Sequence, residues 1–211
     1  MIVIDNFVSD PHALRTEAAS LDYGVMGPFY PGVRAPVPAA TLNQFMPPLI
    51  DLIAHTFGFR GHIRLLDAAY SLVTTPPAQL APIQRLPHYD GLDRERIALL
   101  HYLSPPAFGG TAFYRHRSTG YNYVSRARAA HFAAALEADV ARFGLPEPGY
   151  INGDTRIYEQ TAHYPAKFNR ALIYQGFTLH SGVIPPDQPL SADPRHGRLT
   201  VNTFVMGSDT A

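Results

Sequence analysis

Turn-forming residues punctuate the whole length of this chain. Twenty prolines and sixteen glycines are spread over its 211 residues and are not pooled in one linker. Proline lacks a backbone N–H and glycine favours tight turns, so the regular segments between them must be short. The pattern predicts short strands joined by irregular loops. A chain of this length fits one domain, and we expect residues 1–211 to form a single one.

The expected elements follow this punctuation. Residues 10–21 favour a helix with a proline in its first turn. Helical spacing runs over 41–57, but Pro47 and Pro48 interrupt it, so a second helix is expected to begin at this pair. Residues 26–38 are rich in proline and glycine and predict a loop. An alanine-rich helix is expected at 125–143, and strands at 2–4, 63–75, 97–103, 111–114, 156–164, 171–178 and 199–206.

This order of elements favours a mainly β fold with flanking helices (α+β). Strands outnumber helices and do not alternate with them as βαβ units, which argues against a doubly wound parallel sheet. A jelly roll, in which two sheets face each other around a central cavity, fits best. We expect an N-terminal helical part over about 1–60 and a jelly-roll core over about 63–206.

Charge and cysteine content narrow the classes of partner. Seventeen basic residues balance seventeen acidic ones, so no strong overall field would attract nucleic acid or an anionic membrane. The absence of cysteine excludes disulfides, thiolate metal sites and cysteine nucleophiles. Asp5 and Asn6 interrupt the apolar start, and no stretch reaches the roughly 20 apolar residues that span a bilayer. We therefore expect a cytoplasmic protein that acts on a small molecule or a peptide.

Two ligand-type side chains lie two residues apart at His88 and Asp90. In an extended chain such residues project to the same face, so an imidazole nitrogen and a carboxylate oxygen can meet at one point. His180, at the end of an apolar strand, is the leading candidate for a third ligand. Two histidines and one carboxylate form a facial triad that leaves coordination positions open, as oxygen-activating iron(II) requires.

A second group follows on the last expected strand. Arg198 and Thr200 share a face, where they can pair with a carboxylate and donate a hydroxyl hydrogen bond. The alternative is a solvent-exposed arginine at a strand edge. The order His-x-Asp, distal His and then Arg-x-Thr favours a shared site.

These motifs resemble the 2-oxoglutarate and iron(II)-dependent oxygenase superfamily, particularly its prolyl-hydroxylase-like branch. The resemblance covers roughly residues 63–206 and implies a double-stranded β-helix. The segments Tyr102-Leu103-Ser104 and Gly109-Gly110-Thr111-Ala112-Phe113 are similar to two further family motifs. The set also resembles a small bacterial family of uncharacterised proteins that carry a Pro-His-x-Asp and a Phe-Tyr-Arg-His segment.

The resemblance implies a role for each motif. His88, Asp90 and His180 would bind iron(II), while Arg198, Thr200 and Tyr102 would hold the distal carboxylate of the co-substrate 2-oxoglutarate. The implied activity is hydroxylation of a small molecule, an amino acid or a peptide side chain, with release of succinate and CO2. A carboxylate at position 90 favours hydroxylation, because halogenating family members carry a small residue there.

Two other functions stay open. A cupin-like metal enzyme would keep the three metal ligands without using 2-oxoglutarate and would leave Arg198 without a role. A non-catalytic jelly-roll binding protein would carry the His-x-Asp motif incidentally. Fold alone does not separate these functions.

Several residues compete for the assigned roles. Many family members place the basic residue closer to the distal histidine than the eighteen residues found here, so Arg195 is an alternative to Arg198. His101 and His116 are alternative metal ligands, although His101 should face away from Tyr102 and pack in the core. The segment Arg115-His116-Arg117 predicts either a site for an anionic substrate beside the iron or a solvated basic face.

Overall fold

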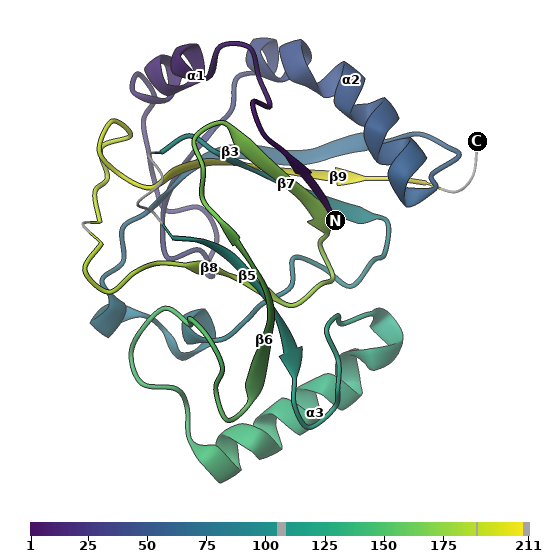
Figure 1. Cartoon of the computed structure of the whole chain (residues 1–211), viewed down its shortest axis with the longest axis vertical. Coiled ribbons are helices and arrows are strands. Elements are labelled where there is room, and N and C mark those ends of the chain that lie inside the picture. Colours follow the sequence, from purple (N-terminus) through teal and green to yellow (C-terminus); the bar gives the residue numbers. More distant parts are fainter. Residues whose placement is uncertain (105–108, 189, 209–211) are drawn as a thin grey trace.

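Two antiparallel sheets form the centre of the molecule. The computed structural model describes residues 1–104, 109–188 and 190–208 (Figure 1). The larger sheet has the strand order β1-β7-β4-β9-β3-β2, and the smaller has the order β6-β5-β8. This arrangement confirms the predicted mainly β jelly roll, and the two sheets do not close into a barrel. The strands are β1 (Ile2–Ile4), β2 (Gly32–Pro36), β3 (Arg64–Val73), β4 (Arg96–Tyr102), β5 (Gly110–His116), β6 (Tyr158–Pro165), β7 (Arg170–Gln175), β8 (His180–Val183) and β9 (Leu199–Met206).

Helices cover the outer faces of both sheets. Helices α1 (Pro11–Ala18) and α2 (Ala39–Phe57) lie over the larger sheet, whereas α3 (Arg126–Phe143) lies on the far side of the smaller sheet (Figure 1). The Asp10 side chain caps α1 by accepting a 2.9 Å hydrogen bond from the Ala13 N–H. Among the described residues, no helix combines the length and the hydropathy needed to cross a bilayer.

Along the central strands, successive side chains point alternately to the core and to the pocket. On β9, Leu199 and Val201 pack into the core beneath α1 and α2, whereas Thr200 and Asn202 face the space between the sheets. On β4, Ile97 points to the same helix-side core. Each strand of the larger sheet thus buries one apolar row and offers its other row to a pocket.

The second helix begins earlier than predicted. It runs unbroken from Ala39 to Phe57 with Pro47 and Pro48 in its interior. Both prolines are exposed, while Leu42, Met46 and Ile53 form a buried stripe at helical spacing. Packing of this stripe on the larger sheet outweighs the cost of two missing backbone donors.

Two strands differ from the sequence prediction. Residues 32–36, predicted as loop, form the edge strand β2, which pairs with β3 from Gly32↔Val73 to Pro36↔Ala69. An edge position tolerates the flanking prolines, which lack N–H donors. His180 opens β8 instead of ending a strand, because a turn over residues 176–177 separates it from β7.

Candidate metal centre and its pocket

A pocket of about 730 Å³ lies between the sheets. Residues of β2, β3, β4 and β9 form its inner wall. Apolar side chains of Phe29, Ile83, Phe132 and Leu136 line part of it, and of these Phe132 is buried. Phe29 and Ile83 are exposed on the surface. The pocket therefore combines polar side chains with an apolar part that reaches the surface.

His88, Asp90 and His180 meet in this pocket. One ligand atom from each of the three lies within 4.8 Å of the others, and among the described residues this is the only such group of three or more. Asp90 Oδ2 lies 3.5 Å from His180 Nε2, and Asp90 Oδ1 lies 3.9 Å from His88 Nε2. An ion about 2.1 Å from each donor fits between atoms at these separations.

Backbone hydrogen bonds hold the three residues in place. His88 and His180 form an isolated bridge, in which each N–H donates to the other's carbonyl oxygen at 2.8 and 2.9 Å. The Asp90 N–H donates to the Gly176 carbonyl at 2.6 Å. His180 Nδ1 lies 2.8 Å from the Thr178 carbonyl oxygen, so Nδ1 carries the proton and Nε2 has a free lone pair toward Asp90.

The pKa shifts of His88 and Asp90 are compatible with binding of a cation by these residues. The pocket walls remove His88 from bulk water, although 52% of its side chain is accessible within the pocket. This desolvation lowers the pKa of His88, helped by the charges of His180 and Arg34. Burial raises the pKa of Asp90, against the opposing effect of His180, Arg96 and Arg34. Asp90 Oδ2 is buried and has no hydrogen-bond partner among the described residues. A bound cation would remove the cost of burying this carboxylate, so the residues fit a metal.

Arg198 and Thr200 line the same cavity, whereas Tyr102 does not line it and bonds Thr111 Oγ1, a lining residue, at 2.7 Å. Arg198, Thr200 and Tyr102 are almost fully buried. Tyr102 and Thr200 are register partners on β4 and β9, and the Arg198 guanidinium carbon lies 5.7 Å from the centre of the Tyr102 ring. The Arg198 guanidinium donates to the Gly110 carbonyl at 3.0 Å. Burial raises the pKa of Tyr102, so its hydroxyl keeps its proton.

The competing residues lie elsewhere. Arg195 is exposed and pairs with Asp193 at 3.5 Å outside the pocket. His101 is buried on the helix side of β4, bonds Asn169 Oδ1 at 3.0 Å and has its pKa lowered by burial to about 4. This confirms the predicted packed histidine. His116 is buried 3.2 Å from Asp139, beneath α3.

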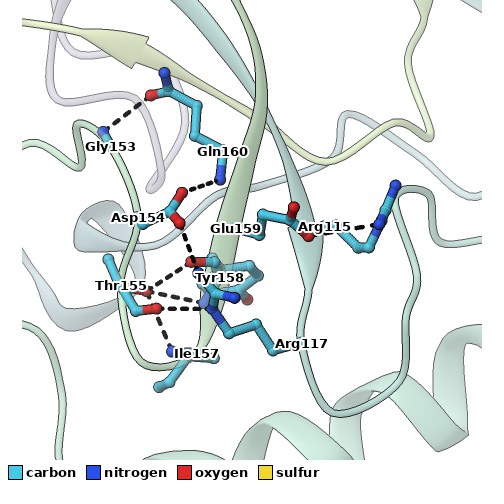
Figure 2. A network of polar contacts seen from close by, with 9 residues as sticks. All are labelled: Arg115, Arg117, Gly153, Asp154, Thr155, Ile157, Tyr158, Glu159 and Gln160. Atoms are coloured by element: carbon cyan, nitrogen blue, oxygen red, sulfur yellow. Dashed lines mark hydrogen bonds and ion pairs between the residues drawn. The ribbon is translucent and has the colours of Figure 1, made fainter.

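The arginines around His116 do not form an open anion site. Figure 2 shows Arg115 against Glu159 and Arg117 against Asp154, at 3.5 and 2.8 Å. Asp154 also accepts the Gln160 backbone N–H at 2.8 Å. These contacts neutralise both side chains at the outer edge of the smaller sheet. Neither arginine lines the pocket, so the two arginines match the second alternative, a solvated face, whereas His116 between them is buried.

Sequence reasoning missed three pocket residues. Arg34 and Arg96 line the pocket, as does Tyr174, whose pKa burial raises well above its usual range. Arg96 opens β4 and its guanidinium carbon lies 5.0 Å from the Phe204 ring centre. Arg34 lies in the segment predicted as loop. A strand pattern of Val33, Arg34 and Ala35 was the available signal, and the surrounding prolines masked it.

Almost the whole chain matches a known protein family. Residues 1–205 match a family described as a family of unknown function, DUF6445. The chain belongs to the DUF6445 family. A search of curated proteins returned no match.

Several solved structures share the fold of this DUF6445 protein. HygX from Streptomyces hygroscopicus, solved with nickel and 2-oxoglutarate bound, is 14% identical, with a TM-score of 0.57 over 98% of this chain and 82% of that one. The viral collagen prolyl hydroxylase vCPH from Paramecium Bursaria Chlorella virus-1, in a 2OG complex, is 12% identical, with a TM-score of 0.52 over 98% and 95%. The carbocyclase SnoK, described as non-heme and alpha-ketoglutarate dependent, is 11% identical, with a TM-score of 0.52 over 98% and 79%. The fold predicted from the motifs, that of the 2-oxoglutarate and iron(II)-dependent oxygenases, is confirmed.

Proposed function

We propose that this protein is a non-haem iron(II) and 2-oxoglutarate-dependent oxygenase. His88, Asp90 and His180 would hold iron(II), and Arg198, Thr200 and Tyr102 would hold the distal carboxylate of 2-oxoglutarate. The observation that carries the proposal is that the three candidate metal ligands line one cavity together with Arg198 and Thr200. The fold shared with structures that bind 2-oxoglutarate supports it.

Each protein group has a distinct task. When bound, iron(II) and 2-oxoglutarate supply the oxidising power, with 2-oxoglutarate ending as succinate and CO2. The Thr178 carbonyl holds the His180 ring in one tautomer. Arg198 offers a buried positive charge, whereas the Tyr102 hydroxyl bonds Thr111 Oγ1 at 2.7 Å and would have to exchange this partner for the co-substrate carboxylate.

The proposal extends to the reaction and the domain. The carboxylate at position 90 favours hydroxylation of a small molecule, an amino acid or a peptide side chain. The whole chain would act as one oxygenase domain in the cytoplasm. The strands β1 and β2, from the N-terminal part, join the larger sheet and so belong to the same folding unit.

Calorimetry of the metal-free protein tests this proposal. Nickel(II), which binds without redox chemistry, is titrated first and 2-oxoglutarate second, into wild type and His88→Ala. The expected result is metal binding in wild type, 2-oxoglutarate binding only after the metal, and loss of both in His88→Ala. Asp93→Ala is the control, because Asp93 lies near the triad in sequence but pairs with Arg126 at the surface.

The other outcomes separate the alternatives. Metal binding without 2-oxoglutarate binding would indicate a cupin-like metal enzyme. A protein that binds no metal would contradict the triad and indicate a binding protein.

A further inference from the structure

The pocket contains one more arginine than the proposed chemistry uses. Five charged side chains of Asp and Arg line it: Arg34, Asp67, Asp90, Arg96 and Arg198. Bound iron(II) carries two positive charges and 2-oxoglutarate two negative ones, so they cancel. Three guanidiniums against two carboxylates then leave one positive charge inside the pocket.

The locations of the three arginines assign this excess positive charge to Arg34. Arg198 lies beside Tyr102 and Thr200, where the co-substrate carboxylate is proposed to bind. Arg96 and Arg34 both lower the pKa of Asp90, Arg96 the more strongly, and Arg96 also stacks on Phe204, the register partner of Asp67. Arg96 thus has the stronger interaction with Asp90, and Arg198 has the proposed co-substrate carboxylate. Arg34 forms no ion pair with any carboxylate of the described residues.

The fold holds Arg34 in a fixed position. Its backbone pairs with Ser71 of β3 on one side and with Gly24 on the other, where the two Gly24–Arg34 hydrogen bonds measure 2.8 and 3.0 Å. The neighbouring Val33 packs against the helix-side core, so strand alternation directs Arg34 into the pocket. Its guanidinium carbon lies 4.0 Å from the centre of the Tyr30 ring.

The Arg34 guanidinium contacts the Tyr30 ring. Arg34 Nε is buried and lacks a hydrogen-bond partner among the described residues, as does Arg96 Nε. A buried donor without a partner is costly, and a ligand oxygen would remove that cost. The flat guanidinium presents paired donors that match the two oxygens of a carboxylate.

Arg34 lies close to the candidate metal ligands and one strand away from the proposed co-substrate site. Arg34 pairs in register with Ser71, Ser71 with Thr200, and Thr200 with Tyr102. One strand therefore separates Arg34 from Thr200, and two separate it from Tyr102. Its charge still influences both His88 and Asp90. A molecule held by Arg34 would therefore lie close to the candidate metal ligands.

We propose that Arg34 is the anchor for the substrate, and that the substrate carries a carboxylate next to an apolar portion. This inference rests on the proposed function. One excess charge matches one carboxylate, whereas a phosphate monoester would need further donors. The apolar portion would contact Phe29 and Ile83, two exposed apolar side chains that line the pocket.

The test compares an acid with its amide. Phenylacetate and phenylacetamide are titrated by calorimetry into the full chain loaded with nickel(II) and 2-oxoglutarate, with phenyl phosphate as a third probe. Wild type should bind phenylacetate at least tenfold more tightly than phenylacetamide or phenyl phosphate. Arg34→Met should lose that preference, because a hydrogen-bonded charge pair contributes about tenfold to hundredfold. Arg34→Lys should keep part of it.

The matched control is Arg126→Met, since Arg126 is exposed and pairs with Asp93 at 2.9 and 3.1 Å outside the pocket wall. This variant should keep the acid preference. If Arg34→Met does not fold by circular dichroism, Arg34→Gln replaces it.

Four outcomes would overturn the assignment of Arg34. In the first two, wild type binds none of the three probes, or it binds phenylacetate and phenylacetamide with equal affinity. In the other two, Arg34→Met keeps the preference for the acid, or wild type binds phenyl phosphate more tightly than phenylacetate. Loss of 2-oxoglutarate binding in Arg34→Met would instead make Arg34 a co-substrate residue. If wild type itself binds no nickel(II) or 2-oxoglutarate, the proposed function fails. The preference for acid over amide is then measured without nickel(II) and 2-oxoglutarate, and it still decides the role of Arg34.

Discussion

At the scale of single residues, the candidate site combines groups that are costly to bury unless ligands occupy them. Asp90 is a buried carboxylate whose Oδ2 has no hydrogen-bond partner among the described residues and lies 3.5 Å from His180 Nε2. Arg198 is a buried charged side chain that donates to the Gly110 carbonyl and lines the same cavity. Such groups lower the stability of a fold unless a metal or a carboxylate offsets the loss of hydration. Their presence together in one pocket is the basis of the proposed function.

Arg198→Met should weaken 2-oxoglutarate binding while leaving metal binding intact. The substitution removes the positive charge but keeps an unbranched side chain that fills much of the same space. The expected loss in 2-oxoglutarate affinity is about tenfold to hundredfold. The affinity is measured by calorimetry on the nickel(II)-loaded protein.

Arg195→Met serves as the control for this substitution. Arg195 competes with Arg198 in sequence, but it is exposed and pairs with Asp193. Its removal should leave the 2-oxoglutarate affinity unchanged. A larger effect at position 195 than at 198 would reverse the assignment.

At the scale of elements, patterned segments were predictable and irregular ones were not. The strand ending at Tyr102 and the strand starting at Leu199 follow from apolar runs between turn residues. Strand β2 does not, because its five residues lie among prolines and pair only through their backbone with β3. The candidate metal ligands His88, Asp90 and His180 could therefore be proposed from the sequence, but Arg34 could not, because its direction depends on that pairing.

Gly32→Ala should destabilise the edge of the larger sheet. A Cβ at this position would lie 1.9 Å from the Leu72 carbonyl oxygen, so β2 would have to move away from β3. We expect the free energy of unfolding to fall by about 1–3 kcal/mol in urea titrations.

Gly24→Ala is the matched control for this strand. Gly24 bridges Arg34 from the other side, and nothing lies within 4 Å of a Cβ added there. Its effect should be within about 0.5 kcal/mol. Equal effects of the two substitutions would contradict the described packing of β2.

Pro48→Ala should stabilise α2. Pro48 is an exposed interior residue of the helix and leaves the carbonyl four residues earlier without its usual donor. Alanine restores that donor. The stabilisation of the helix by the restored hydrogen bond exceeds the destabilisation from the greater entropy of the unfolded chain, which is worth about 0.4–1 kcal/mol. Urea titration should show an increase of about 1 kcal/mol or more in the free energy of unfolding. A decrease would mean that the prolines stabilise this helix.

At the scale of the whole molecule, two sheets lie between α1 and α2 on one side and α3 on the other (Figure 1). This arrangement was predictable from the order of strands and helices. The volume and charge of the cavity between the sheets were not, because residues from seven strands, from α3 and from loops line it together.

Stability should fall as the pH drops from about 6.5 toward 4. Burial lowers the pKa of His101 from 6.5 to about 4, so the unfolded chain takes up this proton first. The stabilisation from neutral His101 is complete above pH 6.5 and is lost as the pH approaches the folded-state value. The loss amounts to roughly 3 kcal/mol.

His101→Gln isolates this contribution to the pH dependence. The amide can still bond Asn169 but does not titrate. Urea titrations between pH 7 and 4 should show a smaller decrease in the free energy of unfolding for this variant. An unchanged pH dependence would assign the acid sensitivity to other groups.

The most direct test of the proposed function is an anaerobic absorption titration of the metal-free protein with iron(II) and then 2-oxoglutarate. We expect a weak visible charge-transfer band that appears only when iron(II) and 2-oxoglutarate are both present. We expect no such band in the His88→Ala and Asp90→Ala variants. Binding of iron(II) with no band after addition of 2-oxoglutarate would contradict the oxygenase assignment.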